Sequence, residues 1–380
     1  MLRVLFVDDE PKLLEGLRRS LRAKREVWDM RFEGGGEAAL RAIDEGPFDV
    51  VVTDMRMPGI DGATLLGEIH ARCPGTIRMV LSGQTSPEDV LRAVPAAHRF
   101  LAKPCETRTL IAAVDRVESV RSRLPSEALR ALVGGVASLP IAARLREALF
   151  EALRAGTSSP TQIARLLERD PGVSAKVLQL VHSAFFGTAR RAIGVADAVA
   201  FLGTGTIETV ARSLPVSEAT ALHEKIAQDG VGVARICAAL AEGCEPAAAF
   251  TAGLLHDVGR LAILAQAREV AERIDAVADG GGSIAAAERE TFGASHADLG
   301  AYLLGVWGFP LDVVEAVRHH HGPSRSESAS LDLVGALHLA SELVHGDPAV
   351  EELDHVYLAR AGFVDRLPEL RARAAAALAA

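Results

Sequence analysis

The stretch 48–62, FDVVVTDMRMPGIDG, constrains the fold of this chain more than any other. Its β-branched run, three valines at 50–52, is typical of a buried strand in a parallel sheet. The run ends at a single acid, Asp54, and the helix-breaking residues Pro58 and Gly59 come after it. Open α/β sheets place their chemistry just beyond the carboxyl ends of the strands, so Asp54 is positioned to act as a carboxylate nucleophile.

Length and composition set the outer limits. The chain has 380 residues, of which 49% are hydrophobic, so we expect two or three domains with real cores. A net charge of −9 argues against a basic nucleic-acid surface over the whole protein. The four cysteines lack C-x-x-C spacing, which favours reduced thiols over disulfides or zinc. The start does not resemble a signal peptide, and no uncharged apolar run reaches membrane-spanning length, so we expect a cytoplasmic protein without a membrane partner.

Residues 1–122 alternate between strand-like and helix-like segments. The patterns predict strands over 2–7, 27–32, 48–53, 77–81 and 98–101. They predict helices over 11–21, 37–43, 63–71 and 107–120, and a short one after Pro87. Five such βα units around one parallel sheet form an α/β doubly wound, five-stranded fold.

Polar residues come directly after four of the five predicted strands. Asp8 and Asp9 follow the first strand, Asp54 the third, Ser82 the fourth and Lys103 the fifth. A doubly wound sheet gathers them into one cleft, where three carboxylates call for a hard cation such as Mg²⁺. A hydroxyl and an ammonium suit the oxygens of a phosphoryl group, so the cleft predicts formation of an aspartyl phosphate. The alternative is that these are solvated loop residues without a shared role. That alternative is reasonable for any one of them taken alone, but it does not explain why all five lie at matching strand ends.

The motifs VLFVDDE, VVTDMRMPGIDG, LSG and FLAKP resemble the receiver domain of bacterial two-component response regulators, over residues 1–122. The resemblance implies that a histidine kinase phosphorylates Asp54 and that Ser82 and Lys103 contact the phosphoryl group. It also implies a Mg²⁺ site, made by Asp8, Asp9, Asp54 and the backbone carbonyl of Arg56.

The same resemblance implies a conformational switch and one unusual peptide bond. Phe100 occupies the family's aromatic switch position and would move together with Ser82, although a plain core phenylalanine is the alternative. The Lys103–Pro104 bond would be cis. Residues 123–138 form a predicted helical linker in which Ser126 caps a new helix. Because no Gly/Ser-rich tether is present, we expect the first domain to be closely coupled to the remainder of the chain.

From residue 139 the pattern is alanine- and leucine-rich and predicts helices throughout. Residues 156–187 look at first like a helix-turn-helix, with helices over 159–167 and 175–183. A recognition helix should present several polar side chains to DNA, yet the second helix offers Lys176 and Gln179 among apolar residues. This pattern favours burial over DNA reading.

A second candidate site lies further along the chain. The apolar segment AAAFTAGLLHDVGRLAIL contains the adjacent pair His256 and Asp257. His296 and the triplet His319, His320 and His321 could complete a metal site of imidazole and carboxylate ligands. The alternative is structural, since a histidine at a helix end interacts favourably with the helix dipole and a buried His–Asp pair can satisfy itself.

This half resembles the HDOD domain, a relative of the HD and HD-GYP phosphohydrolases. The matching stretches lie within 130–345 and include ARLLERDPGVSAKVLQLVHSAFFG, VADAVAFLGTGTIETV, FTAGLLHDVGRLAIL, FGASHADLGAYLLGVWGFP and AVRHHHGP. We therefore predict an HDOD output domain over 139–345 with an all-α, HD-like fold, and a helical tail over 346–380. Two positions depart from the active enzymes, with Asp229 in place of a histidine and Ser341 in place of an aspartate. The resemblance implies a non-catalytic domain, so we expect no metal at the degenerate site formed by Asp229, His256, Asp257, His296 and His320.

The sequence therefore predicts a response regulator whose HDOD half acts by protein–protein contact, with a downstream signalling protein or in a homodimer. Two alternatives stay open. One is a receiver-regulated, metal-dependent phosphodiesterase of a nucleotide second messenger. The other is a DNA-binding regulator, which the acidic charge and the apolar second helix disfavour.

Overall fold

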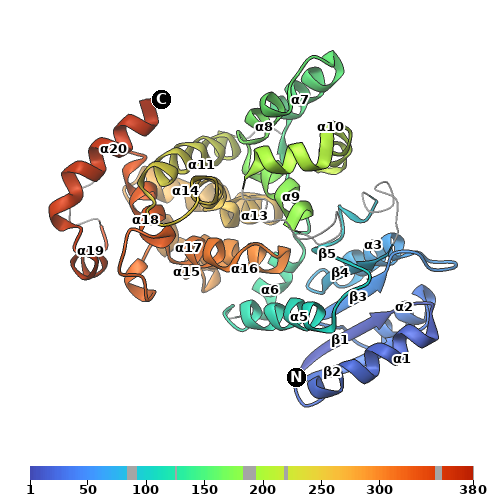
Figure 1. Ribbon diagram of the computed structural model, residues 1–380. Coiled ribbons are helices and arrows are strands. Elements are labelled where there is room, and N and C mark those ends of the chain that lie inside the picture. The colour runs from blue at the N-terminus through green and yellow to red at the C-terminus, as the bar shows by residue number, and fades with distance from the viewer. Residues whose placement is uncertain (84–91, 125, 183–193, 218–220, 347–352, 380) are drawn as a thin grey trace.

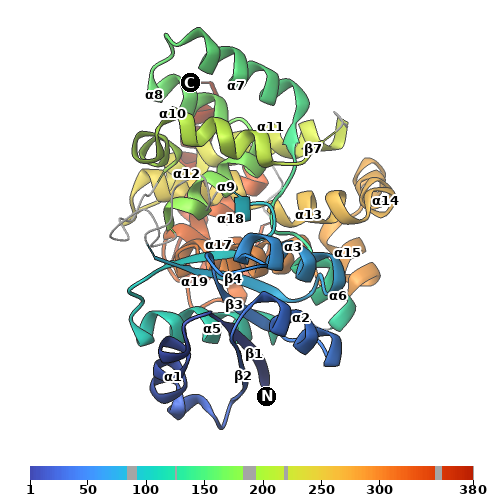
Figure 2. The ribbon, with the colours of Figure 1, turned by 90° about the vertical axis from the view of Figure 1, so that its right-hand side faces the viewer.

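The computed structural model shows an α/β part followed by a helical part (Figure 1). It describes residues 1–83, 92–124, 126–182, 194–217, 221–346 and 353–379. Seen from the side, the helical part lies above the α/β part (Figure 2).

The α/β part is built on a five-stranded parallel sheet in the order β2-β1-β3-β4-β5. The strands are β1 (Leu2–Val7), β2 (Trp28–Glu33), β3 (Val50–Asp54), β4 (Ile77–Ser82) and β5 (Arg99–Ala102). The helices are α1 (Pro11–Ser20), η1 (Arg22–Lys24), α2 (Gly36–Glu45), α3 (Gly62–Arg72) and α5 (Thr107–Arg121). The predicted doubly wound fold is confirmed, with most element ends shifted by one or two residues. The helix predicted after Pro87 lies outside the described residues.

Strand β3 explains why the valine run constrains the fold so strongly. All five of its residues are buried, because strands pair with it on both sides and helices cover its faces. Its register places Thr53 beside Val7 of β1 through the β1–β3 ladder and Asp54 beside Leu81 of β4. Asp54 is the last residue of the strand, so the strand ends that carry the acids meet at one edge of the sheet.

The helical part contains most of the remaining elements. They are α6 (Glu127–Gly134), α7 (Ala143–Ala155), α8 (Pro160–Leu167), α9 (Pro171–His182), α10 (Val195–Ser213), α11 (Ala221–Leu240), α12 (Pro246–Leu255), α13 (Val258–Gln266), α14 (Arg268–Asp279), α15 (Ile284–Phe292), α16 (His296–Trp307), α17 (Leu311–His319), η3 (Pro323–Arg325), α18 (Leu333–Leu343), α19 (His355–Ala361), η5 (Val364–Arg366) and α20 (Leu367–Ala379).

One feature corrects the expectation of helices throughout. The segments β6 (Ile141–Ala142) and β7 (Val216–Ser217) form a two-stranded parallel sheet. Strands of two residues are too short to leave an alternating pattern in the sequence, which is why the sequence did not indicate them.

The segment that resembled a helix-turn-helix is part of the core. A capping box between Ser159 and Gln162 starts α8, and α9 begins after a short turn. Every residue from Pro171 to Val181 in α9 is buried. Lys176 Nζ donates to the carbonyl of Ala137 at 2.8 Å, and Gln179 Nε2 donates to the carbonyl of His98. Neither side chain is available to DNA in this arrangement.

The two parts share a packed interface, as the absence of a flexible tether predicted. Helix α9 contacts β5, and α16 packs along α5. The approach at Gly305 of α16 is so close that an added Cβ would lie 2.7 Å from a methyl group of Val120 in α5. Arg123 and Glu315 form an ion pair at 2.8 Å across the same interface. Ser126 caps α6 by accepting from the amide of Leu129, as predicted.

Two further segments of the helical part pack through their apolar side chains, and the second lies in the core. Helix α20 packs on α11, where Leu370 is fully buried and Arg373 donates to the carbonyl of Ala239 at 2.6 Å. The segment Pro246–Gln266, which covers α12 and α13, is long and apolar enough to cross a membrane. However, 83% of its apolar window is buried inside the structure, so its hydrophobicity is accounted for by packing.

Candidate functional site

The predicted acidic cleft lies at the carboxyl ends of β1 and β3. Asp8 is buried and Asp9 is exposed, and both follow β1. Lys103 Nζ donates to Asp8 Oδ2 at 2.6 Å and also to Asp54 Oδ1, so one ammonium joins two carboxylates. The other oxygen of Asp54 accepts from the amide of Arg56 at 2.7 Å. The structure thus brings Asp8, Asp54 and Lys103 into direct contact, as predicted.

The local backbone explains how these groups meet. The peptide bond between Lys103 and Pro104 is cis, as predicted. At the start of α3, the backbone of Gly62 approaches Asp54 so closely that a Cβ would lie 2.2 Å from the Asp54 carbonyl. Only glycine fits there, which accounts for the glycine that ends the stretch 48–62.

The carboxylates of the cleft stabilise a positive charge beside them. Burial opposes the charge of Lys103, but its hydrogen bonds to Asp54 and Asp8 outweigh this and raise the pKa of the ammonium. Receiver domains generally bind Mg²⁺ for phosphorylation, and three carboxylates at this edge provide the oxygen ligands that Mg²⁺ prefers. The residues present therefore fit the ion. The Mg²⁺-binding roles predicted for Asp8, Asp9, Asp54 and the carbonyl of Arg56 stay predictions.

The structure describes the side chain of one predicted switch residue, Phe100, but not that of the other, Ser82. Phe100 lies on β5, paired with Val80 of β4, and is fully buried. Burial fits both a core residue and an inward position of a switch, so its predicted role stays a prediction. Ser82 ends β4 opposite Ala102, but its side chain lies outside the described residues.

A cluster of histidines forms the second candidate site. Asp257 Oδ1 lies 3.5 Å from His256 Nε2 and 3.2 Å from His296 Nε2. The rings of His296 and His320 have centroids 5.5 Å apart, and those of His256 and His320 are 5.2 Å apart. His321 Nε2 lies 2.8 Å from His296 Nε2. The potential ligand atoms of two groups, His256–Asp257–His320 and His296–His320–His321, each lie within 4.8 Å of one another.

The hydrogen bonds fix how three of these imidazoles are oriented. Nδ1 of His256 donates to the carbonyl of Gly253 at 2.7 Å, and Nδ1 of His320 donates to the carbonyl of Val317 at 2.6 Å. Nδ1 of His296 donates to the carboxylate of Glu288 at 2.6 Å. Since carbonyls and carboxylates only accept, these contacts place the proton on Nδ1 and leave Nε2 as the nitrogen that faces the cluster.

Packing of α13 against α16 brings the cluster together. A Cβ on Gly259 would lie 2.0 Å from the carbonyl of His296, so the glycine after His256 and Asp257 permits this close approach. Arg260 on the same helix donates to Asp257 at 2.9 Å and to Asp275 at 2.7 Å. The guanidinium therefore neutralises one side of Asp257.

The charges in the cluster shift its pKa values in opposite directions. Burial opposes ionisation of Asp257, but His256, His296 and Arg260 hold the pKa of its carboxyl well below the usual range. Burial also opposes the charge of His296, but the nearby carboxylates of Glu288 and Asp257 outweigh the effect of burial and raise the pKa of this imidazole. Burial, with His256 and His296 nearby, keeps the pKa of His320 well below its usual value. His320 Nε2 is buried without a hydrogen-bond partner among the described residues.

The remaining predicted positions lie beside the cluster rather than in it. Asp229 of α11 is near enough to interact electrostatically with Asp257 and His256, yet it belongs to neither ligand group. Ser341, at the place of a metal-binding aspartate, donates to the carbonyl of His338. The triplet at 319–321 contributes His320 and His321 to the cluster, as the sequence indicated. Sequence reasoning left Glu288 and Arg260 out of the site, because only the fold brings them to it.

Comparisons with known proteins divide the chain in the same way. A family model of the response regulator receiver domain matches residues 4–115, and a model of the HDOD domain matches residues 139–323. The hydrogenase transcriptional regulatory protein HoxA of Cupriavidus necator is 34% identical over 103 residues, which cover 27% of this chain and 21% of that protein. The transcriptional regulatory protein GlrR of Escherichia coli is 27% identical over 183 residues, which cover 48% and 39%. The transcriptional regulatory protein TrcR of Mycobacterium tuberculosis is 30% identical over 176 residues, which cover 45% and 65%.

The chain thus spans less than two thirds of the length of these relatives. Among solved structures, the MmoQ response regulator of Methylococcus capsulatus is 25% identical with a TM-score of 0.47, covering 62% of this chain and 98% of that chain. The signal receiver domain of an HD domain-containing protein of Pseudomonas fluorescens is 27% identical with a TM-score of 0.30, covering 32% and 98%. The chain is a response regulator in which an N-terminal receiver domain is followed by an HDOD domain.

Proposed function

We propose that a histidine kinase phosphorylates Asp54 and that the HDOD domain answers by changing a protein–protein contact. The observation that carries this proposal is the packed interface between the two domains. The fully buried α9 of the HDOD domain contacts β5, the strand that carries Phe100. A change at the phosphorylation cleft would therefore meet the output domain without an intervening flexible segment.

The chemistry derives from the groups in the cleft. One carboxylate oxygen of Asp54 attacks the phosphorus atom of a phosphohistidine, the P–N bond breaks, and the imidazole leaves with the electron pair. Lys103 must exchange at least part of its contact with Asp54 for the new phosphoryl oxygens. Mg²⁺ held by Asp8, Asp9 and Asp54 would neutralise the charge on the transferred group.

The proposed output is a contact with a protein rather than with DNA or a substrate. The relatives HoxA, GlrR and TrcR are transcriptional regulators by name, but the helix of this chain that could have read DNA is buried. The described cysteines are free thiols, which supports a cytoplasmic location. The partner would be a downstream signalling protein or a second copy of this chain.

Hydrogen exchange of the full chain tests the proposal. The chain would be compared with and without Mg²⁺ and a small phosphodonor, and an Asp54→Asn variant would serve as the matched control. We expect phosphorylation of the unmodified chain only, together with faster exchange in α9 and α16. Phosphorylation that leaves exchange in both helices unchanged would refute the coupling. A variant at position 54 that is still phosphorylated would refute the acceptor.

A second candidate function rests on the histidine cluster. The Nδ1 atoms of His256, His296 and His320 are held by carbonyls or a carboxylate, and Nε2 of His256 and of His296 lies within 3.5 Å of Asp257 Oδ1. Imidazoles oriented in this way are typical ligands of transition metals. Nε2 of His320 is buried without a hydrogen-bond partner among the described residues, so its lone pair is available to such an ion. The residues thus fit zinc, iron or manganese, in contrast to our expectation of no metal, and a metal held there could support phosphohydrolase chemistry.

Elemental analysis of the purified chain distinguishes the two candidates. About one equivalent of metal per chain, lost in a His256→Ala variant, would favour the second candidate, and hydrolysis of nucleotide phosphodiesters would then be assayed. Metal binding without hydrolysis would make the site structural. Absence of metal after growth and refolding in metal-supplemented medium would exclude the second candidate and leave the HDOD half as a docking module.

A further inference from the structure

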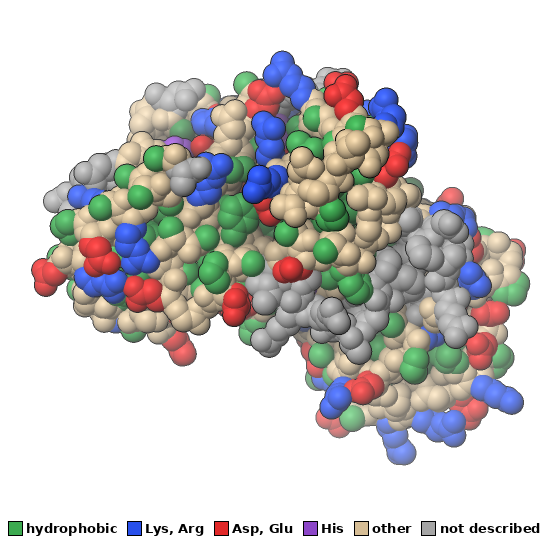
Figure 3. All heavy atoms as spheres, turned by 45° about the horizontal axis from the view of Figure 1, so that its top comes forward, with side chains coloured by type: hydrophobic (Ala, Val, Ile, Leu, Met, Phe, Trp, Pro, Cys, Tyr) green, Lys and Arg blue, Asp and Glu red, His purple; other side chains and the backbone are tan. Residues whose placement is uncertain are grey.

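A groove of about 970 Å³ opens on the HDOD domain, apart from the receiver cleft and the histidine cluster. Helices α7, α8, α11 and α12 contribute its lining, together with the residues between α8 and α9. Figure 1 shows α7 and α8 in green beside α11 in yellow, and in Figure 3 basic side chains gather around a hollow on this side of the molecule. The volume lies near the upper end of the range for sites that bind small molecules.

Four arginines and three carboxylates line the groove, and two of the carboxylates are already engaged. Asp170 is almost fully buried and accepts from the amides of Ala142 and Gly172 and from His223. Glu224 lies 3.7 Å from Arg144, within ion-pair distance. Glu224 is therefore paired with Arg144, whereas the hydrogen bonds of Asp170 hold its carboxylate without cancelling its formal charge.

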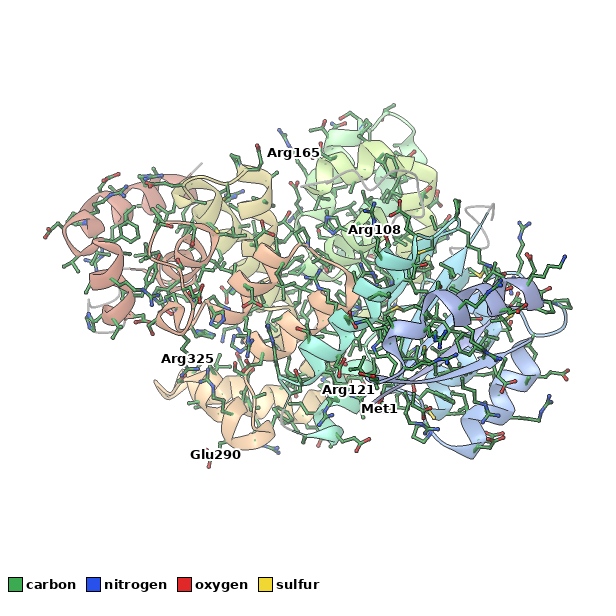
Figure 4. All side chains as sticks on the ribbon, turned by 60° about the horizontal axis from the view of Figure 1, so that its bottom comes forward. Met1, Arg108, Arg121, Arg165, Glu290 and Arg325 are labelled. Carbon is green, nitrogen blue, oxygen red and sulfur yellow. The ribbon has the colours of Figure 1, made fainter. Side chains whose placement is uncertain are left out.

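The other three arginines are exposed and lack a close acidic partner. Arg165, Arg169 and Arg235 form no salt bridge or side-chain hydrogen bond among the described residues. Their charge is opposed by Asp170 and by Glu168, whose pKa is raised by burial although Arg165 acts against the shift. Figure 4 shows Arg165 where the green helices face the yellow ones. Four arginines against three lining carboxylates leave the groove with a formal excess of one positive charge.

One wall of the groove is apolar. Phe250 of α12 is half-buried in this wall, beside Val231 and Ala227 of α11. Guanidinium groups bind phosphate oxygens in a bidentate manner. Guanidinium groups and aromatic side chains both stack on planar rings, so either could contact the ring of a ligand. The groove thus combines guanidinium groups that suit phosphate with an apolar wall, and Arg235 lies one turn beyond Val231 on the helix of that wall.

We propose that this groove binds a small phosphorylated ligand with a planar apolar portion, the chemistry of a nucleotide. Arg169 and Arg235 would contact the phosphates, and Phe250 would contact the ring system. Half-buried Glu168 is placed to accept a hydrogen bond from a hydroxyl or amino group of the ligand. Such a ligand would give the HDOD domain an input that is independent of phosphorylation at Asp54.

Titration calorimetry on the full chain tests the proposal with two probes, inorganic pyrophosphate and ATP. EDTA is present throughout, because it removes the metal that anion binding at the receiver cleft or the histidine cluster would need. We expect both probes to bind, and ATP to bind at least about tenfold more tightly because its ring adds contact with Phe250. Affinity should fall as salt rises.

Charge reversal then locates the site. The pair Arg169→Glu and Arg235→Glu should weaken both probes by at least about tenfold. The matched control pair, Arg273→Glu and Arg289→Glu, changes the net charge equally on exposed residues of α14 and α15 that do not line the groove. Phe250→Leu should weaken ATP and leave pyrophosphate unchanged. If charge reversal disturbs folding, the pair Arg169→Gln and Arg235→Gln replaces it.

Each result bears on the proposal. No binding of either probe at millimolar concentration would overturn it, and so would equal losses in the groove and control pairs, since these would indicate nonspecific charge attraction. ATP no tighter than pyrophosphate would overturn the nucleotide-like ligand. Binding of an acidic peptide in place of both probes would reassign the groove to a protein partner. None of these outcomes depends on whether Asp54 is phosphorylated.

Discussion

The receiver cleft and the histidine cluster solve the same problem with different groups. Both gather charged or polar side chains at the ends of secondary-structure elements. In the receiver, Lys103 supplies a cation to Asp8 and Asp54, so these two carboxylates have a partner before any ion binds. In the HDOD domain, Arg260 neutralises only one side of Asp257, and the imidazoles bring buried nitrogens rather than permanent charge. The first site is satisfied by the chain alone, whereas the second retains an unused lone pair.

Removing the cation of the first site should have the largest effect. In a Lys103→Met variant, Asp8 and Asp54 would face each other without a partner in a largely buried cleft. We expect the free energy of unfolding to fall by about 3 kcal/mol in EDTA, because breaking a buried ion pair leaves uncompensated charge. Millimolar Mg²⁺ should recover much of this loss by taking the place of the ammonium.

Urea unfolding monitored by circular dichroism, with and without Mg²⁺, measures both quantities. A Lys12→Met variant, which removes a charge from an exposed residue of α1, is the control. A loss that is the same with and without Mg²⁺ would show that the ion does not bind between these carboxylates.

The next prediction compares two buried histidines of the HDOD domain. Nδ1 of each donates to a carbonyl, but Nε2 of His338 accepts from the amide of Asp354, whereas Nε2 of His320 has no partner among the described residues. Without metal, His338→Leu should lower the free energy of unfolding by about 2 kcal/mol, since it leaves buried polar groups unpaired. His320→Leu should lower it by about 1 kcal/mol or less.

If the cluster binds metal, adding zinc or manganese should distinguish the two variants in a second way. The ion should stabilise the unmodified chain and the His338→Leu variant but leave His320→Leu unchanged, because only the last lacks a ligand. Thermal unfolding of the three proteins with and without each ion is the measurement. Equal metal stabilisation of all three would exclude His320 as a ligand.

These two sites also differ in how much of them could be predicted from the sequence. The receiver cleft could be predicted from strand ends, because the valines of β3 fix a buried strand and parallel strands align their carboxyl ends. The same reasoning gives the order of the βα units and the neighbours of Asp54. It placed Lys103 in the cleft as a partner of the phosphoryl group, but it did not show that the ammonium joins Asp8 and Asp54 directly, since that reach depends on the backbone after β5.

The histidine cluster depends on how helices pack, which leaves little trace in a single sequence. The adjacent His256 and Asp257 could be recognised as a candidate, and His296 and His320 as distant partners. Glu288 could not, because it meets His296 only through the turn between α15 and α16. The same limit applies to α9, where the pattern predicted burial of Lys176 and Gln179 but not that both would bind carbonyls outside the HDOD domain.

Lys176 extends the comparison to a buried cation that lacks an acidic partner among the described residues, and its expected effect is the smallest. Its ammonium contacts one carbonyl, that of Ala137, and lies near Arg78 and His98. Burial, and to a lesser degree Arg78, lower the pKa of Lys176 to about 7. Between about pH 7 and its ordinary pKa of about 10.4, the unfolded chain binds this proton and the folded chain does not, so this residue's contribution to stability rises with pH.

A Lys176→Met variant should therefore be more stable than the unmodified chain by about 1 kcal/mol near pH 7, after the lost hydrogen bond to Ala137 is allowed for. The advantage should shrink as pH rises, because the lysine of the unmodified chain is then neutral in the folded state. Urea unfolding at several pH values measures the difference, with Lys12→Met as the control for an exposed lysine. A difference that does not change between about pH 7 and about pH 9 would show that Lys176 keeps its proton in the interface. The buried ammonium would then have a partner that the contact with Ala137 does not supply.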